Sequence, residues 1–92
     1  MKIYIVMGTT GEYSDRTEWP VIAFEDKELA KQQVYFASIR ANEIYNQMIN
    51  DINFDLDDNK NKNSYDPNMK MDYTGTSYFI YETTLWENER ND

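Results

Sequence analysis

The chain has 92 residues, enough for one small domain, and 17 acidic against nine basic residues give it a formal net charge of −8. It contains neither cysteine nor histidine, which excludes disulfides, thiolate or imidazole metal ligands, and nucleophilic catalysis of the Ser-His or Cys-His type. No apolar run approaches the ~20 residues of a membrane span, and the first residues lack the apolar core of a signal peptide, so we expect a soluble cytoplasmic protein.

Two β-strands are predicted at the start of the chain. Residues 2–8 are rich in β-branched and aromatic side chains and end at a glycine, and residues 18–25 repeat this pattern. Pro20 cannot donate a hydrogen bond to a sheet, which places it at the start of its strand or on a sheet edge. Residues 8–20 then connect the strands as a hairpin. The alternative is a phosphate-binding loop, which would need a lysine followed by serine or threonine and then a helix.

A single long helix is predicted next. Asp26 is a suitable N-cap, and residues 27–51 place apolar side chains at helical spacing. Tyr35 and Ile39 project from the opposite, polar side of this helix. They indicate either a surface that a loop covers or a surface that binds a partner. The core-facing stripe is predicted to comprise Ala30, Val34, Ala37, Ala41, Ile44, Tyr45, Met48 and Ile52.

A polar loop and a last strand complete the chain. Residues 53–72 are rich in Asn, Asp and Lys and predict a long loop, flexible in part, while residues 76–86 predict a third strand. A right-handed crossover through the helix places this strand beside the first. The expected fold is one α+β domain over residues 1–92, a three-stranded antiparallel sheet of order 2-1-3 (ββαβ) with one long helix on one face.

One helix covers only one face of such a sheet. The other face would expose apolar side chains, drawn from Tyr4, Val6, Tyr78, Ile80 and Trp86 or from the residues that alternate with them. That is a large apolar surface for a stable monomer. We expect a second copy, the long loop or a partner protein to cover it.

The acidic segment of residues 55–66 partly matches a calcium-binding loop. Asp55, Asp57 and Asn59 stand at the first, third and fifth positions, where an EF-hand places oxygen ligands. Lys60 stands where that loop requires glycine, and Asp66 where it prefers glutamate. The simpler interpretation is a solvated acidic loop, and we expect neither a metal nor a cofactor.

The first third of the chain and its last strand carry a further pattern, in the segments KIYIVMGTTGEYSDR, PVIAFEDKELAKQ and YFIYETTLW. A strand runs into a Gly-Glu-Tyr-Ser-Asp loop, a second strand ends in Phe24, and a capped helix begins with the Lys-Glu-Leu-Ala run of residues 27–30. In this the chain resembles a family of small uncharacterised proteins of phage and bacterial genomes. The resemblance implies no established activity. It implies a phage or mobile-element setting, where small acidic proteins often inhibit host defence.

These features predict a non-catalytic interaction protein and not an enzyme. The acidic surface, with Tyr and Trp as rigid anchors, would dock on a basic surface of a host protein. If that surface normally holds nucleic acid, the protein would be an inhibitor of the anti-CRISPR or anti-restriction type. The chain itself is expected to bind neither nucleic acid, because phosphate contacts need Lys and Arg clusters, nor a membrane.

Three alternatives stay open. The protein could bind a small nucleotide-like signal in an aromatic pocket on the open sheet face, roofed by residues 53–72. It could assemble with itself, for example as a homodimer, or its charge could serve solubility alone. The residues predicted to bind the partner are Tyr13, Asp15, Tyr35, Ile39, Asp55, Asp57, Asp58, Tyr78 and Trp86.

Overall fold

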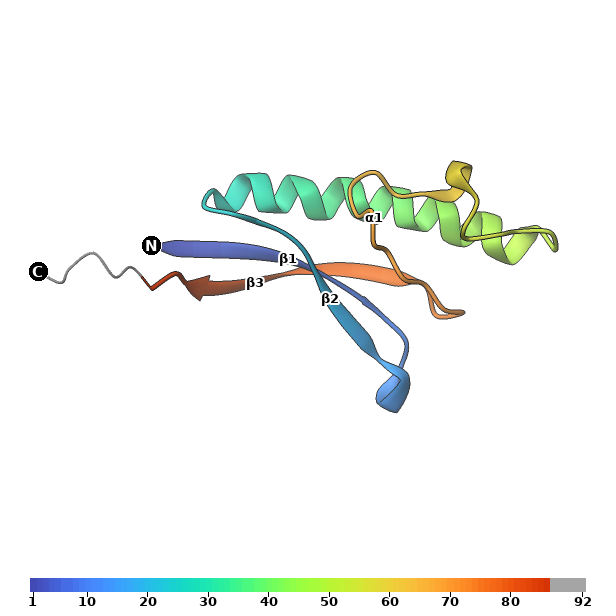
Figure 1. The fold of residues 1–92 in the computed structure, drawn as a ribbon, viewed down its shortest axis with the longest axis horizontal. Helices are drawn as coiled ribbons and strands as arrows, with labels where there is room; N and C mark the ends of the chain where they lie inside the picture. Colours follow the sequence, from blue (N-terminus) through green and yellow to red (C-terminus); the bar gives the residue numbers. More distant parts are fainter. Residues whose placement is uncertain (87–92) are drawn as a thin grey trace, which may run out of the picture.

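A three-stranded antiparallel sheet forms the base of the structure, a computed structural model that describes residues 1–86 (Figure 1). Its strands are β1 (Lys2–Thr10), β2 (Thr17–Phe24) and β3 (Thr76–Thr84). β1 lies in the middle, and the strand order is β2-β1-β3. The predicted α+β fold, its antiparallel sheet and its strand order are confirmed.

The helix α1 (Lys27–Asn50) lies along one face of this sheet, mainly over β3 and β1 (Figure 1). Asp26 caps it as predicted, because its carboxylate accepts a hydrogen bond from the N–H of Glu28 at 2.8 Å. The face turned to the sheet carries small side chains, which let the helix backbone lie close to the strands. Four residues of this face are buried: Ala30, Ala37, Ala41 and Ile44.

Ile52 corrects the predicted core stripe. The helix ends at Asn50, and Asp51 already has an extended backbone. The helical spacing that would turn Ile52 toward the sheet therefore does not reach it, and its side chain is 98% exposed.

The core lies between α1 and the sheet face that carries Val6, Tyr78 and Ile80. β1 continues to Thr10, so the hairpin connector is shorter than predicted and comprises residues 11–16. Gly8 therefore lies within β1, and strand alternation places it on the same face as Val6. A Cβ atom on Gly8 would lie 2.5 Å from the indole of Trp19. The glycine is thus needed for the buried tryptophan to pack this close to β1.

The two sheet edges differ. β2 contains Pro20, as the sequence predicts for an edge strand, and its pairing with β1 shifts by one residue between Val6 and Met7. β3 is nine residues long, has no proline and pairs with β1 without a shift. The β2 edge therefore carries a proline and a register irregularity, two of the features with which proteins usually protect an edge strand, and β3 carries neither.

The long loop folds back along α1 and includes a short 3-10 helix, η2 (Asn59–Asn61) (Figure 1). The Asn63 side chain donates to the carbonyl of Ala37 in α1 at 3.1 Å, and the Tyr65 ring stacks on Phe36 at 5.5 Å between centroids. The loop thus packs on the helix and on the helix side of the sheet. The predicted roof over the open sheet face is wrong.

Candidate interaction surface

The sheet face turned away from α1 is not covered by any described residue, and we call it the open face. Strand alternation places on it the side chains that lie between the core residues. Tyr81, on β3, is its most exposed large side chain at 57%. The open face consists mainly of Ile3, Ile5, Met7 and Thr9 from β1, Phe79, Tyr81 and Thr83 from β3, and Pro20 and Ala23 from β2.

Charge is nearly absent from the open face, although 28% of the chain is charged. Within the strands, the residue of this face that carries a charge is Glu18, and Arg16 neutralises it at 2.8 Å. Uncharged apolar residues at the centre with charges at the rim are typical of protein interfaces. The sequence predicted an uncovered apolar face made either of residues drawn from a set of five or of their alternates. The alternates lie on the open face, whereas four of the named set belong to the core side: Tyr4, Val6, Tyr78 and Ile80, with Trp86 as the fifth member beyond the end of β3.

The hairpin tip adds an exposed aromatic side chain beside one end of the open face. A 3-10 turn, η1 (Tyr13–Asp15), joins β1 to β2, and Tyr13 is 94% exposed. Its φ of 53° lies in the left-handed region, which is uncommon for residues other than glycine. The predicted pair Tyr13 and Asp15 is thus exposed and presented by one short turn.

Tyr78 is the clearest correction among the predicted binding residues. Its side chain points toward α1, is 8% exposed, and donates from its hydroxyl to Asp66 Oδ2 at 2.7 Å. Burial, together with this hydrogen bond, raises the pKa of the Tyr78 hydroxyl above its ordinary value. A buried, bonded side chain offers no surface to a partner.

Asp66 fastens the long loop to the sheet. It is 1% exposed, and the same Oδ2 also accepts a hydrogen bond from Trp19 Nε1 at 3.0 Å. Asn63, equally buried, lies 3.4 Å from the Tyr78 hydroxyl. Sequence reasoning missed this network because its members come from β2, the loop and β3. It treated Asp66 only as a possible calcium ligand.

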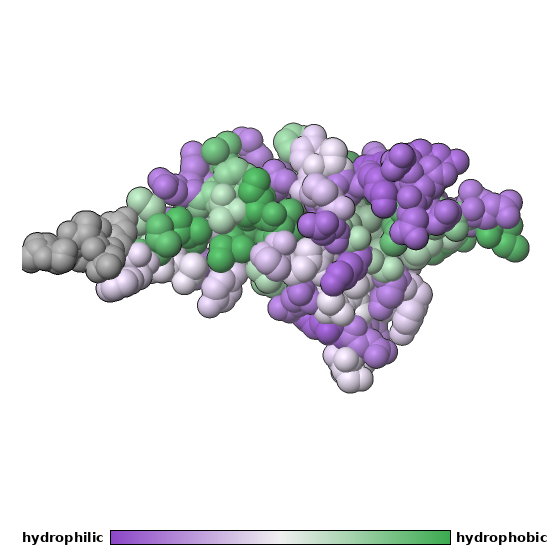
Figure 2. All heavy atoms as spheres, in the orientation of Figure 1, coloured by the Kyte–Doolittle hydropathy of each residue, from purple (hydrophilic) through white to green (hydrophobic). Residues whose placement is uncertain are grey.

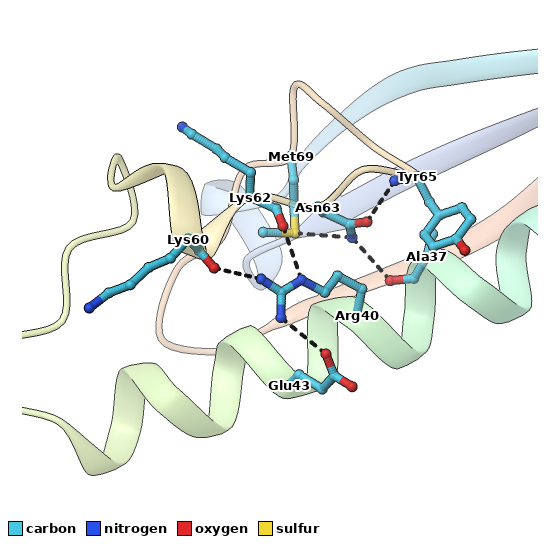
Figure 3. Close-up of polar contacts among 8 residues, drawn as sticks. All are labelled: Ala37, Arg40, Glu43, Lys60, Lys62, Asn63, Tyr65 and Met69. Carbon is cyan, nitrogen blue, oxygen red and sulfur yellow. Dashed lines mark hydrogen bonds and ion pairs between the residues drawn. The ribbon is translucent and has the colours of Figure 1, made fainter.

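Arg40 holds the other half of the loop (Figure 3). Its guanidinium donates to the carbonyls of Lys60 and Lys62 at 2.8 and 3.0 Å and to the Glu43 carboxylate at 3.0 Å. The lysine carbonyls belong to η2 and the residue after it, so the arginine binds the end of this short helix. Figure 3 also shows the Asn63 amide directed at the Ala37 carbonyl of α1.

The acidic turn that contains Asp55, Asp57 and Asp58 is exposed, and two of its carboxylates serve the local backbone. Asp55 accepts from the N–H of Asp57 at 3.0 Å, and Asp58 accepts from the N–H of Lys60 at 3.1 Å. Within residues 1–86 no group of three acidic, histidine or cysteine side chains could hold a metal ion. The calcium-loop pattern is therefore not assembled, and its last member, Asp66, points into the core.

The other predicted residues lie apart from one another. Tyr35 and Ile39 are neighbours on the outer side of α1, 62% and 42% exposed, and Trp86 follows β3 at 77%. Figure 2 shows hydrophilic side chains gathered over the second half of α1 and the loop, and hydrophobic ones where the first half of α1 meets the sheet. The predicted residues thus form several exposed groups and not one site.

Cavities in the described chain are small or open. The smallest of three, lined by Asn61, Asn63 and Asp66 among others, measures about 50 Å³, and two hollows beside the hairpin tip, of about 230 and 530 Å³, are more open to solvent. Enclosed ligand pockets are usually about 300–1,000 Å³. None of these three is an enclosed space of that size.

No described helix has both the length and the apolar character needed to cross a membrane. Comparison of the chain with protein-family models, with characterised proteins and with solved structures finds no match.

Proposed function

We propose that this protein is a non-catalytic interaction protein whose open face docks on a partner protein with a basic surface. The observation that carries the proposal is the open face itself, an apolar and almost uncharged sheet surface on a chain of net charge −8. Contiguous apolar surface that a fold leaves uncovered marks interaction sites more often than single exposed residues do.

Tyrosine and phenylalanine on β3 supply the anchors of this surface. Tyr81 is more than half exposed, and Phe79 lies two residues away on the same face. Aromatic side chains bury a large area at a small cost in conformational entropy, and they are enriched among the residues that dominate binding energy. The open face therefore provides the short-range part of the interaction.

Acidic residues supply the long-range part. Glu12 and Asp15 lie at the hairpin end of the sheet, and together with the net charge they attract a basic partner and raise its encounter rate. A basic protein surface commonly binds nucleic acid. Its occupation by this chain would inhibit that binding, in line with the anti-defence role that the resemblance to small phage proteins implies.

Affinity capture with the intact chain tests the proposal. The chain is immobilised and challenged with host lysate at about 50 mM and about 500 mM salt, because screening should release a partner that charge attracts. We expect a basic protein that is retained at low salt, displaced by excess nucleic acid, and lost when Tyr81→Ala removes an anchor.

Tyr35→Ala is the matched control, since Tyr35 is a tyrosine of similar exposure on the outer side of α1. Loss of the partner from this variant, with retention by Tyr81→Ala, would move the binding surface to the helix. Recovery of no basic protein at either salt concentration would reject the proposed function.

A further inference from the structure

Within residues 1–86 β3 is a sheet edge that no other strand pairs with, and its backbone hydrogen bonds show which groups face outward. The N–H of Leu85 donates to the carbonyl of Met1 at 2.8 Å, so these two residues form a hydrogen-bonded pair. Bonded and non-bonded pairs alternate along an antiparallel ladder. In the β1–β3 register the non-bonded positions on β3 are then Thr76, Tyr78, Ile80, Glu82 and Thr84. The N–H and C=O groups of these five residues point away from β1.

No backbone hydrogen bond within residues 1–86 engages this outward row. β2, the opposite edge, is interrupted by Pro20 and by its register shift, whereas β3 is straight in register and carries one charge, Glu82. A long, regular and weakly charged edge strand is a template for another strand.

We propose that two copies of this chain pair through their β3 edges, antiparallel and centred on Ile80, to form one continuous six-stranded sheet. When a strand pairs antiparallel with its own copy, each residue faces the residue that lies equally far on the other side of the central position. Such pairs must therefore be compatible, and in β3 they are. Centring on Ile80 places Phe79 of one copy opposite Tyr81 of the other on the open face, and such cross-strand aromatic pairs are stabilising.

Charge favours the same register. Glu82 falls opposite Tyr78 of the other copy and keeps its own partner, Lys2, at 2.5 Å. Threonine and serine side chains fall opposite one another toward both ends of the strand. No like charges are therefore opposed, and each of the five outward residues gains a hydrogen-bonded position.

The size of the contact sets the strength of the pairing. A nine-residue ladder is about 30 Å long and one sheet about 10 Å deep, so it buries roughly 300 Å² per copy. That is less than the roughly 800 Å² per partner of a standard interface. Both helices lie on the same side of the joined sheet and mainly over β3 and β1, which brings them together across the two-fold axis. We expect a reversible dimer with a Kd in the micromolar range.

Sedimentation and residue-resolved hydrogen exchange on the intact chain, from about 5 to 500 µM, test this pairing. We expect dimers at the upper end. The amides of Tyr78, Ile80 and Glu82 should become protected as the dimer forms, while those of Phe79 and Tyr81 are protected throughout by β1. Added salt should strengthen the dimer, because it screens the repulsion of two acidic copies. The pairing does not rest on the proposed function, whose complex should weaken in salt.

Glu82→Pro removes an outward N–H without touching the ladder to β1, and Glu82→Ala removes the same side chain but keeps that N–H. Loss of two symmetry-related hydrogen bonds should weaken the dimer at least about tenfold in the proline variant only. A monomer at 500 µM, a dimer with unprotected Ile80 and Glu82 amides, or equal dimerisation of the two variants would each overturn the inference. The exchange pattern of the unaltered chain decides it even if the proline variant unfolds.

Discussion

Asp66 is 1% exposed and accepts hydrogen bonds from Trp19 and Tyr78 through one carboxylate oxygen. The three residues come from the loop, β2 and β3, and they meet only because the fold brings them together. A buried donor that loses its acceptor still bears the free-energy cost of its desolvation, without a hydrogen bond to offset it. The stabilisation by this network therefore depends on the single carboxylate.

Asp66→Ala leaves two buried donors without an acceptor, and we expect it to lower the free energy of unfolding by about 2–4 kcal/mol. Urea unfolding followed by tryptophan fluorescence measures the change. Asp57→Ala, an exposed aspartate of the same loop, is the control and should stay within about 0.5 kcal/mol. Equal losses of unfolding free energy in the two variants would show that the buried network stabilises the fold no more than an exposed aspartate does.

Gly8 lies in the same region, in contact with the ring of Trp19. A Cβ atom there would meet the Trp19 ring at 2.5 Å, so Gly8→Ala forces the indole or the strand to move. We expect a loss of about 1–3 kcal/mol and a changed near-ultraviolet circular dichroism spectrum of the tryptophan. An unchanged spectrum with full stability would contradict this close contact.

At the level of elements, Arg40 connects α1 to η2 through two backbone carbonyls. Arg40→Ala should free this part of the loop while the sheet and helix persist, with faster proteolysis or amide exchange around residues 55–63 and a loss of about 1 kcal/mol. Glu43→Gln removes only the exposed ion pair of Arg40 and should change stability by less than about 0.5 kcal/mol. If amide exchange rose throughout the sheet and helix as much as in the loop, the loop would not unfold independently of the rest of the fold.

The end of the loop is joined to the sheet by Asp72. The hydroxyl and the backbone N–H of Thr74 both donate to its carboxylate, and these bonds, opposed in part by burial, hold the pKa of Asp72 below its ordinary value. Thr10 of β1 contributes a weaker hydrogen bond at 3.2 Å. A hydrogen-bonded turn thus closes the loop against the strands.

The sign of the pH dependence follows from this lowered pKa. The folded chain holds the Asp72 proton less tightly than the unfolded chain, so the stabilisation is fully present above about pH 4 and is lost as the pH falls through the folded value. Asp72→Asn should therefore lower the thermal midpoint at pH 7 and flatten its fall in acid. Lys2 lowers the pKa of Glu82 in the same way, by a hydrogen bond and by its charge. This pair therefore contributes equally to the loss of stability in acid in the unaltered chain and in Asp72→Asn. If the thermal midpoints of the two proteins fell in parallel as the pH is lowered, the role of Asp72 would be contradicted.

The whole chain carries a net charge of −8 on 92 residues, and most of the acidic side chains within residues 1–86 are exposed. Mutual repulsion of these charges opposes the compact state and is screened by salt. We expect the thermal midpoint to rise by about 2–5 °C between about 20 and 300 mM sodium chloride. Replacing Asp55, Asp57 and Asp58 by asparagine keeps the hydrogen-bond acceptors and should reduce this dependence. A midpoint that falls with salt would show that attractive ion pairs dominate.

Local sequence was sufficient for the elements and for their order. The β-branched segments, the Asp26 cap and the position of Pro20 each act within a few residues, and the strand order follows from the handedness of one crossover. The helix boundary was the weak point, since Ile52 continues the apolar spacing after the backbone has left the helix. Periodicity describes a face only while the helix lasts.

The sequence by itself determined that the chain is acidic and has an α+β fold with more apolar surface than a single helix covers, because charge, alternation and helical spacing are properties of neighbouring residues. Only the tertiary structure decided which sheet face remains open, where the loop goes and which residues fasten it. Both faces of β1 carry apolar side chains, so alternation alone cannot choose between them. The choice depends on contacts between distant residues, such as Trp19 with Asp66 and Gly8 with Trp19, which exist only once the chain has folded.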